Sequence, residues 1–226
     1  MEEMIREQQK KVSTGRKLII LAVVMAAVVC VTFGGRLLAG VEDVWLRRFL
    51  NCLQYAVMAV PALVGMKLSG MDIKKQLDFA NAKQYLWAVV IFAALSLTIA
   101  VIPALFGVSF IGSHTEPPAA LIVYAALYYI GFVGTVEELI FRGYIQELLV
   151  EILPKNKWLG AVIAAAIFGL WHWVNGSLVQ VLFTFAIGAF IGLMKYFIKN
   201  CTLISAALGH GLYDFMNIII RIVLIK

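Results

Sequence analysis

Two adjacent glutamates, followed one helical turn later by an arginine, lie within an otherwise apolar stretch of this sequence. Glu137 and Glu138 are neighbours, and Arg142 stands four residues after Glu138. Residues four apart share one face of a helix, whereas adjacent residues point in different directions, so Glu138 is predicted to pair with Arg142 and Glu137 to face elsewhere. A lone glutamate in an apolar pocket can serve as a general base. The alternative is that the cluster only marks the place where an apolar helix reaches water.

Two histidines lie in later apolar stretches. His172 ends the segment FGLWH, and His210 precedes Asp214 by four residues. A lone histidine on an apolar helix is more often a packed, hydrogen-bonded residue than a ligand. A His–Asp pair at this spacing suits either a metal site or a histidine oriented for catalysis. Asn217, further along the same face, is expected to hold neighbouring helices together.

Composition places these residues in a membrane protein. Of 226 residues, 62% are hydrophobic and 14% are charged, and the mean hydropathy is +0.92. Soluble domains are about 45–50% apolar, and the apolar blocks here approach the roughly 20 residues that a spanning helix needs. We therefore expect an all-α polytopic membrane protein with about seven transmembrane helices. The expected spans are 18–39, 50–69, 85–108, 119–152, 158–175, 178–198 and 201–225.

The fourth of these spans, 119–152, is interpreted as one long helix whose second, charged half leaves the membrane. In the sixth span, Gly188 and Gly192 form a GxxxG pattern, which is typical of close helix packing.

The positions of the basic residues predict the orientation in the bilayer. With the amino terminus inside, fourteen of the nineteen Lys and Arg residues lie on the inner side and five on the outer side, which indicates a cytoplasmic amino terminus. The net charge of +6 is then explained by topology, and nucleic acid is not expected as a partner. The apolar run that begins at Leu18 predicts an uncleaved signal anchor. Cys30, Cys52 and Cys201 lie in or beside apolar blocks and are expected to act as small apolar side chains.

The expected hairpin of the fourth and fifth spans brings the polar residues to one depth. Glu137 lies 18 residues before Lys155 in the turn, and His172 lies 17 residues after it, which is about 25 Å along either helix. His210 lies about ten residues past the next turn on the same side, near Asn200. Three unrelated structural groups would not be expected to align in this way. The sequence therefore predicts that Glu137, His172 and His210 share one site in the cytoplasmic half of the bilayer.

Three motifs resemble those of the CAAX-protease and bacteriocin-processing family, also called Abi, which includes the Ras-converting prenyl endopeptidase type. They are EExxxR at 137–142, FxxxH at 168–172 and HxxxD at 210–214. The resemblance covers about residues 119–220. It suggests a division into a cytoplasmic tail at 1–17, three transmembrane helices with their loops at 18–118, and a catalytic four-helix core at 119–226.

The resemblance implies hydrolysis of a peptide bond within the membrane. Glu137 resembles the glutamate that activates water, and His172 resembles the histidine that helps to hold it. His210 resembles an oxyanion-stabilising residue. Glu138 and Arg142 resemble a supporting pair.

Asp214 bears on whether such a reaction needs a metal. The family accepts Asn or Asp at this position, but an ionised aspartate cannot donate a hydrogen bond to an oxyanion. Asp214 is therefore expected to be protonated or, as we favour, to orient or charge His210. His172, His210 and a carboxylate could also bind Zn²⁺, while a glutamate-based mechanism uses the same residues without a metal.

The expected substrate is a membrane-associated peptide or protein that enters from the bilayer or its cytoplasmic face. Prenylated CAAX tails, peptide pheromones and bacteriocin leaders all fit, and the last two suit a bacterial cytoplasmic membrane better. A different class is a non-catalytic immunity or scaffold protein that binds a peptide or a membrane partner. A transporter is a third class, because intramembrane Glu and His also relay protons, although no inverted repeat is evident in the sequence.

Overall fold

The computed structural model describes residues 12–113 and 118–225, and over these residues the chain is helical with no strand. Most of the tail expected at 1–17 therefore lies outside the described residues. The elements, in chain order, are α2 (Thr14–Gly34), η1 (Gly35–Gly40), α3 (Val44–Leu68), α4 (Ile73–Gln76), α5 (Lys83–Leu95), η2 (Ser96–Val101), α6 (Ile102–Leu105), α7 (Ala119–Ala126), η3 (Leu127–Val133), α8 (Gly134–Glu138), η4 (Leu139–Gln146), α9 (Glu147–Ile152), α10 (Lys157–Trp171), η5 (His172–Asn175), α11 (Leu178–Phe197) and α12 (Leu203–Val223).

The expectation of an all-α membrane protein with about seven spans is confirmed. Six helices in the described part of the chain are long and apolar enough to cross a membrane, and α10 is a shorter apolar helix. The second span begins at Val44, six residues before the expected start. Asp43 caps this helix, because its Oδ1 accepts a hydrogen bond from the backbone N–H of Leu46 at 2.7 Å. Counting apolar residues alone misses this start, because Arg47 and Arg48 interrupt the apolar run before residue 50.

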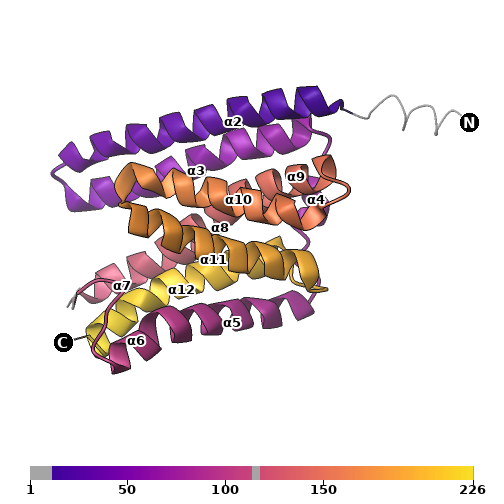
Figure 1. Ribbon diagram of the computed structural model, residues 1–226. Coiled ribbons are helices and arrows are strands. Elements are labelled where there is room, and N and C mark those ends of the chain that lie inside the picture. The colour runs from indigo at the N-terminus through magenta and orange to yellow at the C-terminus, as the bar shows by residue number, and fades with distance from the viewer. Residues whose placement is uncertain (1–11, 114–117, 226) are drawn as a thin grey trace, which may run out of the picture.

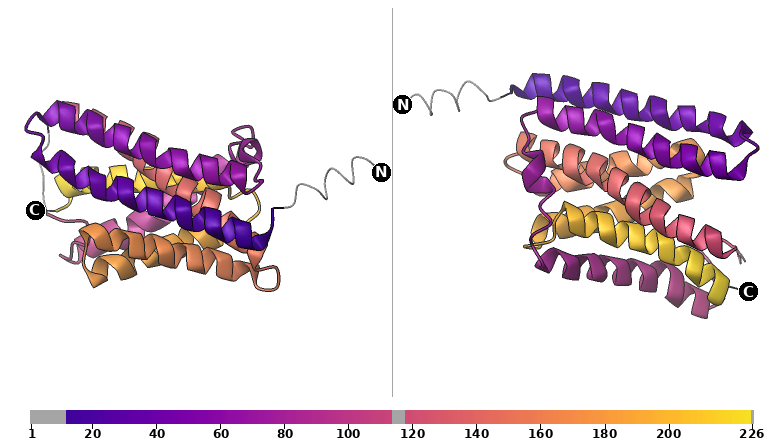
Figure 2. Two further views of the ribbon diagram at one scale, coloured as in Figure 1. Left: turned by 90° about the horizontal axis from the view of Figure 1, so that it is seen from above. Right: turned by 180° about the vertical axis from the view of Figure 1, so that it is seen from behind.

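The helices lie nearly side by side, with their ends gathered at two opposite ends of the bundle (Figure 1). The antiparallel pair α2–α3 forms one side, the pair α10–α11 covers another, and α5 packs against α12 on the side away from α2 (Figures 1 and 2). The composite helix from α7 to α9 lies between them and contacts α3, α10 and α12. The residues with candidate chemistry are therefore carried by the elements at the centre of the bundle.

This composite helix runs unbroken from Ala119 to Ile152, as the sequence predicts. Two π-helical segments, η3 and η4, flank the short α-helical turn α8 that carries both glutamates. Such wide turns occur mostly in short pieces and frequently at functional sites. In the second, charged half of the helix, all eight residues of η4 are buried by neighbouring helices, whereas Glu151 in α9 is exposed.

A close backbone contact fixes the composite helix against α12. A Cβ atom on Gly134 would lie 2.5 Å from the backbone nitrogen of Gly211, so glycine is required for the two helices to approach this closely. Gly134 lies one turn before Glu137 and Glu138, and Gly211 directly follows His210. The contact therefore holds the glutamates beside the histidine.

Candidate active site

Glu138 is the centre of a buried network of charged groups. Its Oε1 accepts a hydrogen bond from Arg142 Nη1 at 2.9 Å and lies 2.8 Å from His210 Nδ1. The side chains of Glu138 and Arg142 are 0% and 1% exposed. The predicted pairing with Arg142 is thus present, and it extends to His210. Because an ionised carboxylate oxygen can only accept, Nδ1 of His210 carries the proton in this contact.

The GxxxG pattern of α11 makes room for this network. A Cβ atom on Gly188 would lie 2.8 Å from Arg142 Nη2, and one on Gly192 would lie 2.8 Å from Gln146 Oε1. The amide of Gln146 also donates a hydrogen bond to the carbonyl oxygen of Gly192 at 3.0 Å. On the other side, the guanidinium of Arg142 lies over the Phe168 ring, 4.6 Å from its centroid. The two glycines therefore have two effects. They allow the helices to pack closely, and they leave space for the polar side chains of Arg142 and Gln146 from the central helix.

Glu137 faces away from that pair and is held by a tyrosine from another span. Its side chain is buried, with 3% of the residue exposed, and its Oε1 accepts a hydrogen bond from the Tyr55 hydroxyl at 3.0 Å. Tyr55 lies on α3, and its ring contacts Tyr128 edge to face. The two adjacent glutamates thus have different partners, as the helical spacing predicts. Glu137 keeps an oxygen that the described hydrogen bonds do not use, while Glu138 is engaged by both Arg142 and His210.

His172 stands at the end of α10, where the helix passes into η5. Its Nδ1 lies 2.9 Å from the carbonyl oxygen of Phe168, so Nδ1–H donates there and Nε2 remains an acceptor when the ring is neutral. The ring packs edge to face against Phe168 and Trp171. Trp171 is in turn fixed by a hydrogen bond from its Nε1 to Thr32 Oγ1 on α2 at 2.9 Å. These contacts hold the imidazole in one orientation and tautomer.

One cavity of about 500 Å³ brings four of the predicted catalytic residues together. Glu137, His172, His210 and Asp214 all line it, and Asp214 Oδ2 lies 3.5 Å from His210 Nε2. Glu138 and Arg142 do not line the cavity. Glu138 contacts His210 Nδ1, and Arg142 pairs with Glu138. Other lining residues are Phe110, Ile111, Gly112, Tyr129, Val133, Phe168, Gln180, Phe183, Thr184, Ile187, Tyr213, Asn217 and Arg221. Asn217, expected to join helices, thus also faces this cavity.

The two histidines that could hold a metal ion, His172 and His210, both line this cavity. Over the described residues, no group of three or more His, Cys, Asp or Glu side chains is placed to hold a metal ion. Both ring nitrogens of His210 already face carboxylates, Nδ1 toward Glu138 and Nε2 toward Asp214. His172 has one free ring nitrogen, Nε2.

Sequence reasoning missed the hydrogen bond that α3 makes to Glu137 and the contribution of α11 to the cavity lining. Tyr55 lies outside residues 119–220, which the family resemblance covers, yet it donates a hydrogen bond to Glu137. A signal was present, because a tyrosine hydroxyl inside an apolar span needs a hydrogen-bond partner. Gln180 and Thr184 of α11 also line the cavity and carry no motif.

The fold and the site define a polytopic membrane protein with a buried cluster of glutamates, histidines and an aspartate around one intramembrane cavity. Residues 118–216 match the family described as "Type II CAAX prenyl endopeptidase Rce1-like". The resemblance carried by the three motifs is thereby confirmed, and residues 118–216 are similar to this family. The match supports an intramembrane endopeptidase of the CAAX type in general terms. No curated protein and no solved structure matches the chain.

Proposed function

We propose that this protein is an intramembrane endopeptidase that hydrolyses a peptide bond in a membrane-associated peptide or protein. The observation that carries the proposal is the shared cavity, where Glu137, His172, His210 and Asp214 meet although they come from three different helices. The Rce1-like match over residues 118–216 supports the same reaction class.

In the proposed reaction, Glu137 acts as the general base. It takes a proton from a water molecule that the free Nε2 of His172 holds by accepting the second hydrogen bond. The water oxygen attacks the carbonyl carbon of the substrate, and a negative charge develops on the carbonyl oxygen. The C–N bond then breaks as Glu137 returns the proton to the leaving amine nitrogen. One carboxylate thus serves first as base and then as acid.

His210 is proposed to stabilise the developing oxyanion. Its Nδ1–H is already donated to Glu138, so Nε2 can donate only in the imidazolium form. Asp214 lies beside Nε2, and Glu138 lies beside Nδ1, so the imidazolium stands between two carboxylates. Asp214 is proposed to orient His210 and not to donate to the oxyanion itself. Fixed donors in a site shielded from water stabilise such charge strongly.

The experiment that tests the function is cleavage of a mixed peptide pool by purified protein in liposomes, scored by mass spectrometry. New fragments in the presence of the wild-type protein, with defined termini, are the expected result. A protein purified in parallel with Glu137→Gln controls for contaminating proteases. Well-folded wild-type protein that cuts nothing in pools of prenylated, lipidated and unmodified peptides would contradict the proposal and favour a peptide-binding or immunity role.

Metal chelation is expected to leave this cleavage unchanged, because the proposed steps use only side chains. The initial rate is measured after dialysis against a strong zinc chelator and again after addition of Zn²⁺. Loss of activity that Zn²⁺ restores would show that the reaction needs a metal ion, and the proposed reaction, which uses side chains alone, would then be wrong.

Tyr55→Phe is expected to lower kcat about tenfold, since a hydrogen bond to a charged group contributes roughly 1.5 kcal/mol or more. The substitution removes only the hydroxyl that donates to Glu137 Oε1. Tyr85→Phe is a matched control, because that hydroxyl donates to the Phe79 carbonyl oxygen on the exposed surface. A pH–rate profile distinguishes positioning from packing. A Tyr55→Phe enzyme with the wild-type profile and wild-type kcat would remove Tyr55 from the mechanism.

A further inference from the structure

The candidate catalytic cavity extends in one direction along α12. His210, Asp214, Asn217 and Arg221 follow one another on a single face of this helix, and all four line the cavity. Arg221 lies eleven positions after His210, which is about 16 Å along the helix axis. The cavity therefore runs from the glutamates toward the end of the bundle where α12 terminates.

Other lining residues lie at that same end. Gln180 belongs to the first turn of α11, and Phe110 and Gly112 belong to the segment after α6. The Phe110 ring also contacts Phe183 of α11, with ring centroids 6.0 Å apart. We call the part of the cavity lined by Phe110, Gly112, Gln180 and Arg221 its mouth.

The opposite direction is closed by packed side chains. Glu138, Arg142 and Gln146 occupy successive turns of the central helix beyond the cavity, and each is at most 1% exposed. Ile191 of α11 and Tyr144 are fully buried at the same level. None of these five residues lines the cavity, so among the described residues its lining does not extend to the end where α2 begins.

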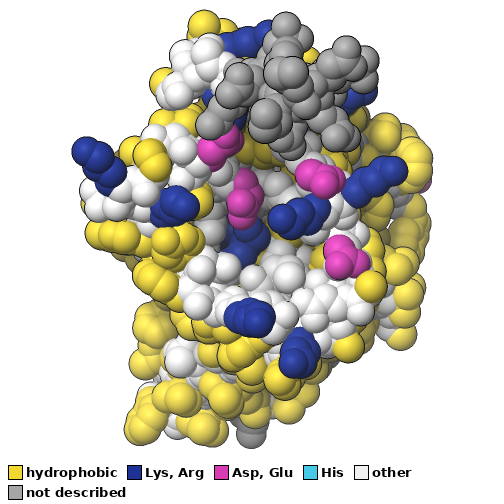
Figure 3. Space-filling model, turned by 90° about the vertical axis from the view of Figure 1, so that its right-hand side faces the viewer, with side chains coloured by type: hydrophobic (Ala, Val, Ile, Leu, Met, Phe, Trp, Pro, Cys, Tyr) yellow, Lys and Arg dark blue, Asp and Glu magenta, His cyan; other side chains and the backbone are white. Residues whose placement is uncertain are grey.

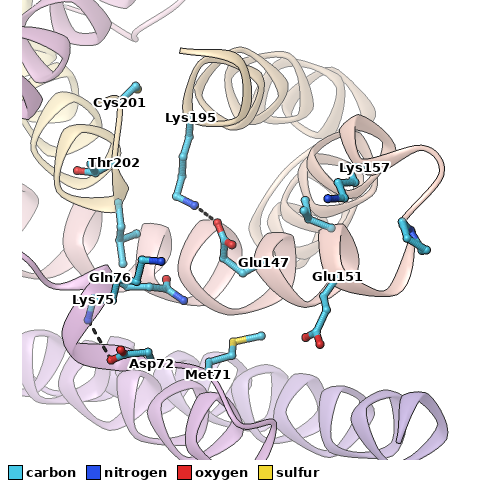
Figure 4. A pocket seen from close by; sticks show the side chains of 13 residues that line it. Met71, Asp72, Lys75, Gln76, Glu147, Glu151, Lys157, Lys195, Cys201 and Thr202 are labelled. Carbon is cyan, nitrogen blue, oxygen red and sulfur yellow. Dashed lines mark hydrogen bonds and ion pairs between the residues drawn. The ribbon is translucent and has the colours of Figure 1, made fainter. Parts of the chain in front are cut away.

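A separate hollow lies at that other end, where α2 begins. It has a volume of about 650 Å³ and shares no lining residue with the catalytic cavity. Lys195 and Glu147 form an ion pair beside it, and Asp72 caps α4 at its edge (Figure 4). The space-filling view of this end shows basic and acidic side chains around the hollow, and no histidine of the described residues is visible there (Figure 3).

Basic residues distinguish the two ends. Ten of the described Lys and Arg residues lie at the end where α2 begins, which we call the cationic end, and four lie at the end that holds the mouth. The ten are Arg16, Lys17, Lys67, Lys74, Lys75, Lys83, Lys155, Lys157, Lys195 and Lys199, and the four are Arg36, Arg47, Arg48 and Arg221. Loops rich in Lys and Arg remain on the cytoplasmic side of a membrane. The cationic end is accordingly the cytoplasmic one.

We propose that the catalytic cavity is entered from the extracytoplasmic side. The substrate is then an exported peptide, or the extracytoplasmic segment of a membrane protein, and not a cytoplasmic carboxyl-terminal tail. This differs from the cytoplasmic entry expected from the sequence, because the depth of a residue along its helix does not reveal which end of a cavity is open. The substrate class rests on the proposed function, whereas the side of entry does not.

Thiol labelling in bacterial cells that express the protein tests the side of entry. Cys30, Cys52 and Cys201, which are free thiols, are replaced by alanine, and one cysteine is then introduced at a time. Gln180→Cys and Phe110→Cys report on the mouth, while Lys157→Cys reports on the hollow at the cationic end. All three positions are exposed. Each variant is treated with a membrane-impermeant maleimide, in intact cells and in inverted membrane vesicles.

The expected result is labelling of both mouth variants in intact cells, with Lys157→Cys labelled only in inverted vesicles. The reverse pattern, or labelling of the mouth from both sides, would overturn the proposal. A second arm offers a cleavable peptide to wild-type protein in right-side-out and inverted vesicles, and cleavage is expected only in the former. Failure of all cleavage with the expected labelling would refute the proposed function and leave the side of entry established.

Discussion

Replacing Glu137 by glutamine is expected to lower the cleavage rate roughly 10²- to 10⁴-fold, the usual contribution of a general base. Glutamine has nearly the same size and can still accept the hydrogen bond that Tyr55 donates. The fold should therefore persist while the proton acceptor is lost. The rate is measured in liposomes at saturating peptide, together with the thermal unfolding temperature in detergent.

Glu147→Gln is the matched control for this experiment. Glu147 lies on the same composite helix but outside the catalytic cavity, where it pairs with Lys195 at the cationic end. Its side chain is 39% exposed, and its replacement should leave the cleavage rate unchanged. Equal rates for wild type and a folded Glu137→Gln variant would show that Glu137 is not the base.

Replacing Glu138 by leucine is expected to lower the free energy of unfolding by about 3–5 kcal/mol. The substitution leaves the fully buried guanidinium of Arg142 without its carboxylate partner, and it removes the group that faces His210 Nδ1. Removing one member of a buried pair costs far more than the pair itself contributes, because the remaining charge is left desolvated. Unfolding in mixed detergent micelles, followed by circular dichroism, gives the measurement.

The double variant Glu138→Leu, Arg142→Met separates this explanation from a general packing defect. Removing both charges should recover much of the lost stability, since an apolar pair of similar volume is often as stable as a buried ion pair. Cleavage should remain low in the double variant, because His210 still lacks its support. A double variant that is less stable than Glu138→Leu alone would contradict the account of the buried network.

The central transmembrane helix, and the ion pair between two residues of that helix, can be predicted from the sequence. The central span is predicted and observed at 119–152, because its apolar run is long and its limits are marked by prolines and charges. The pairing of Glu138 with Arg142 follows from helical spacing alone, and the structure has it at 2.9 Å. Counting residues from the turns also placed Glu137, His172 and His210 at one depth, and they line one cavity.

Side-chain contacts between helices that are distant in the sequence cannot be predicted from residue spacing. Glu138 binds His210 across 72 positions, and Tyr55 reaches Glu137 across 82 positions. Both contacts depend on how each helix is rotated about its axis, which apolar periodicity defines poorly when lipid and protein surround the helix together. Which end of the cavity is open depends on the same helix rotations. It also depends on Arg142 and Gln146, which are buried beyond the other end of the cavity.

The most direct test of the account follows hydrolysis of one defined peptide in water enriched in ¹⁸O. Wild-type protein is predicted to release a fragment whose new carboxyl group carries a solvent oxygen, and Glu137→Gln, prepared in the same liposomes, is predicted to release almost none. Intact peptide in the presence of folded wild-type protein, or equal amounts of labelled fragment from both proteins, would contradict the claim that Glu137 activates water for peptide hydrolysis in this cavity.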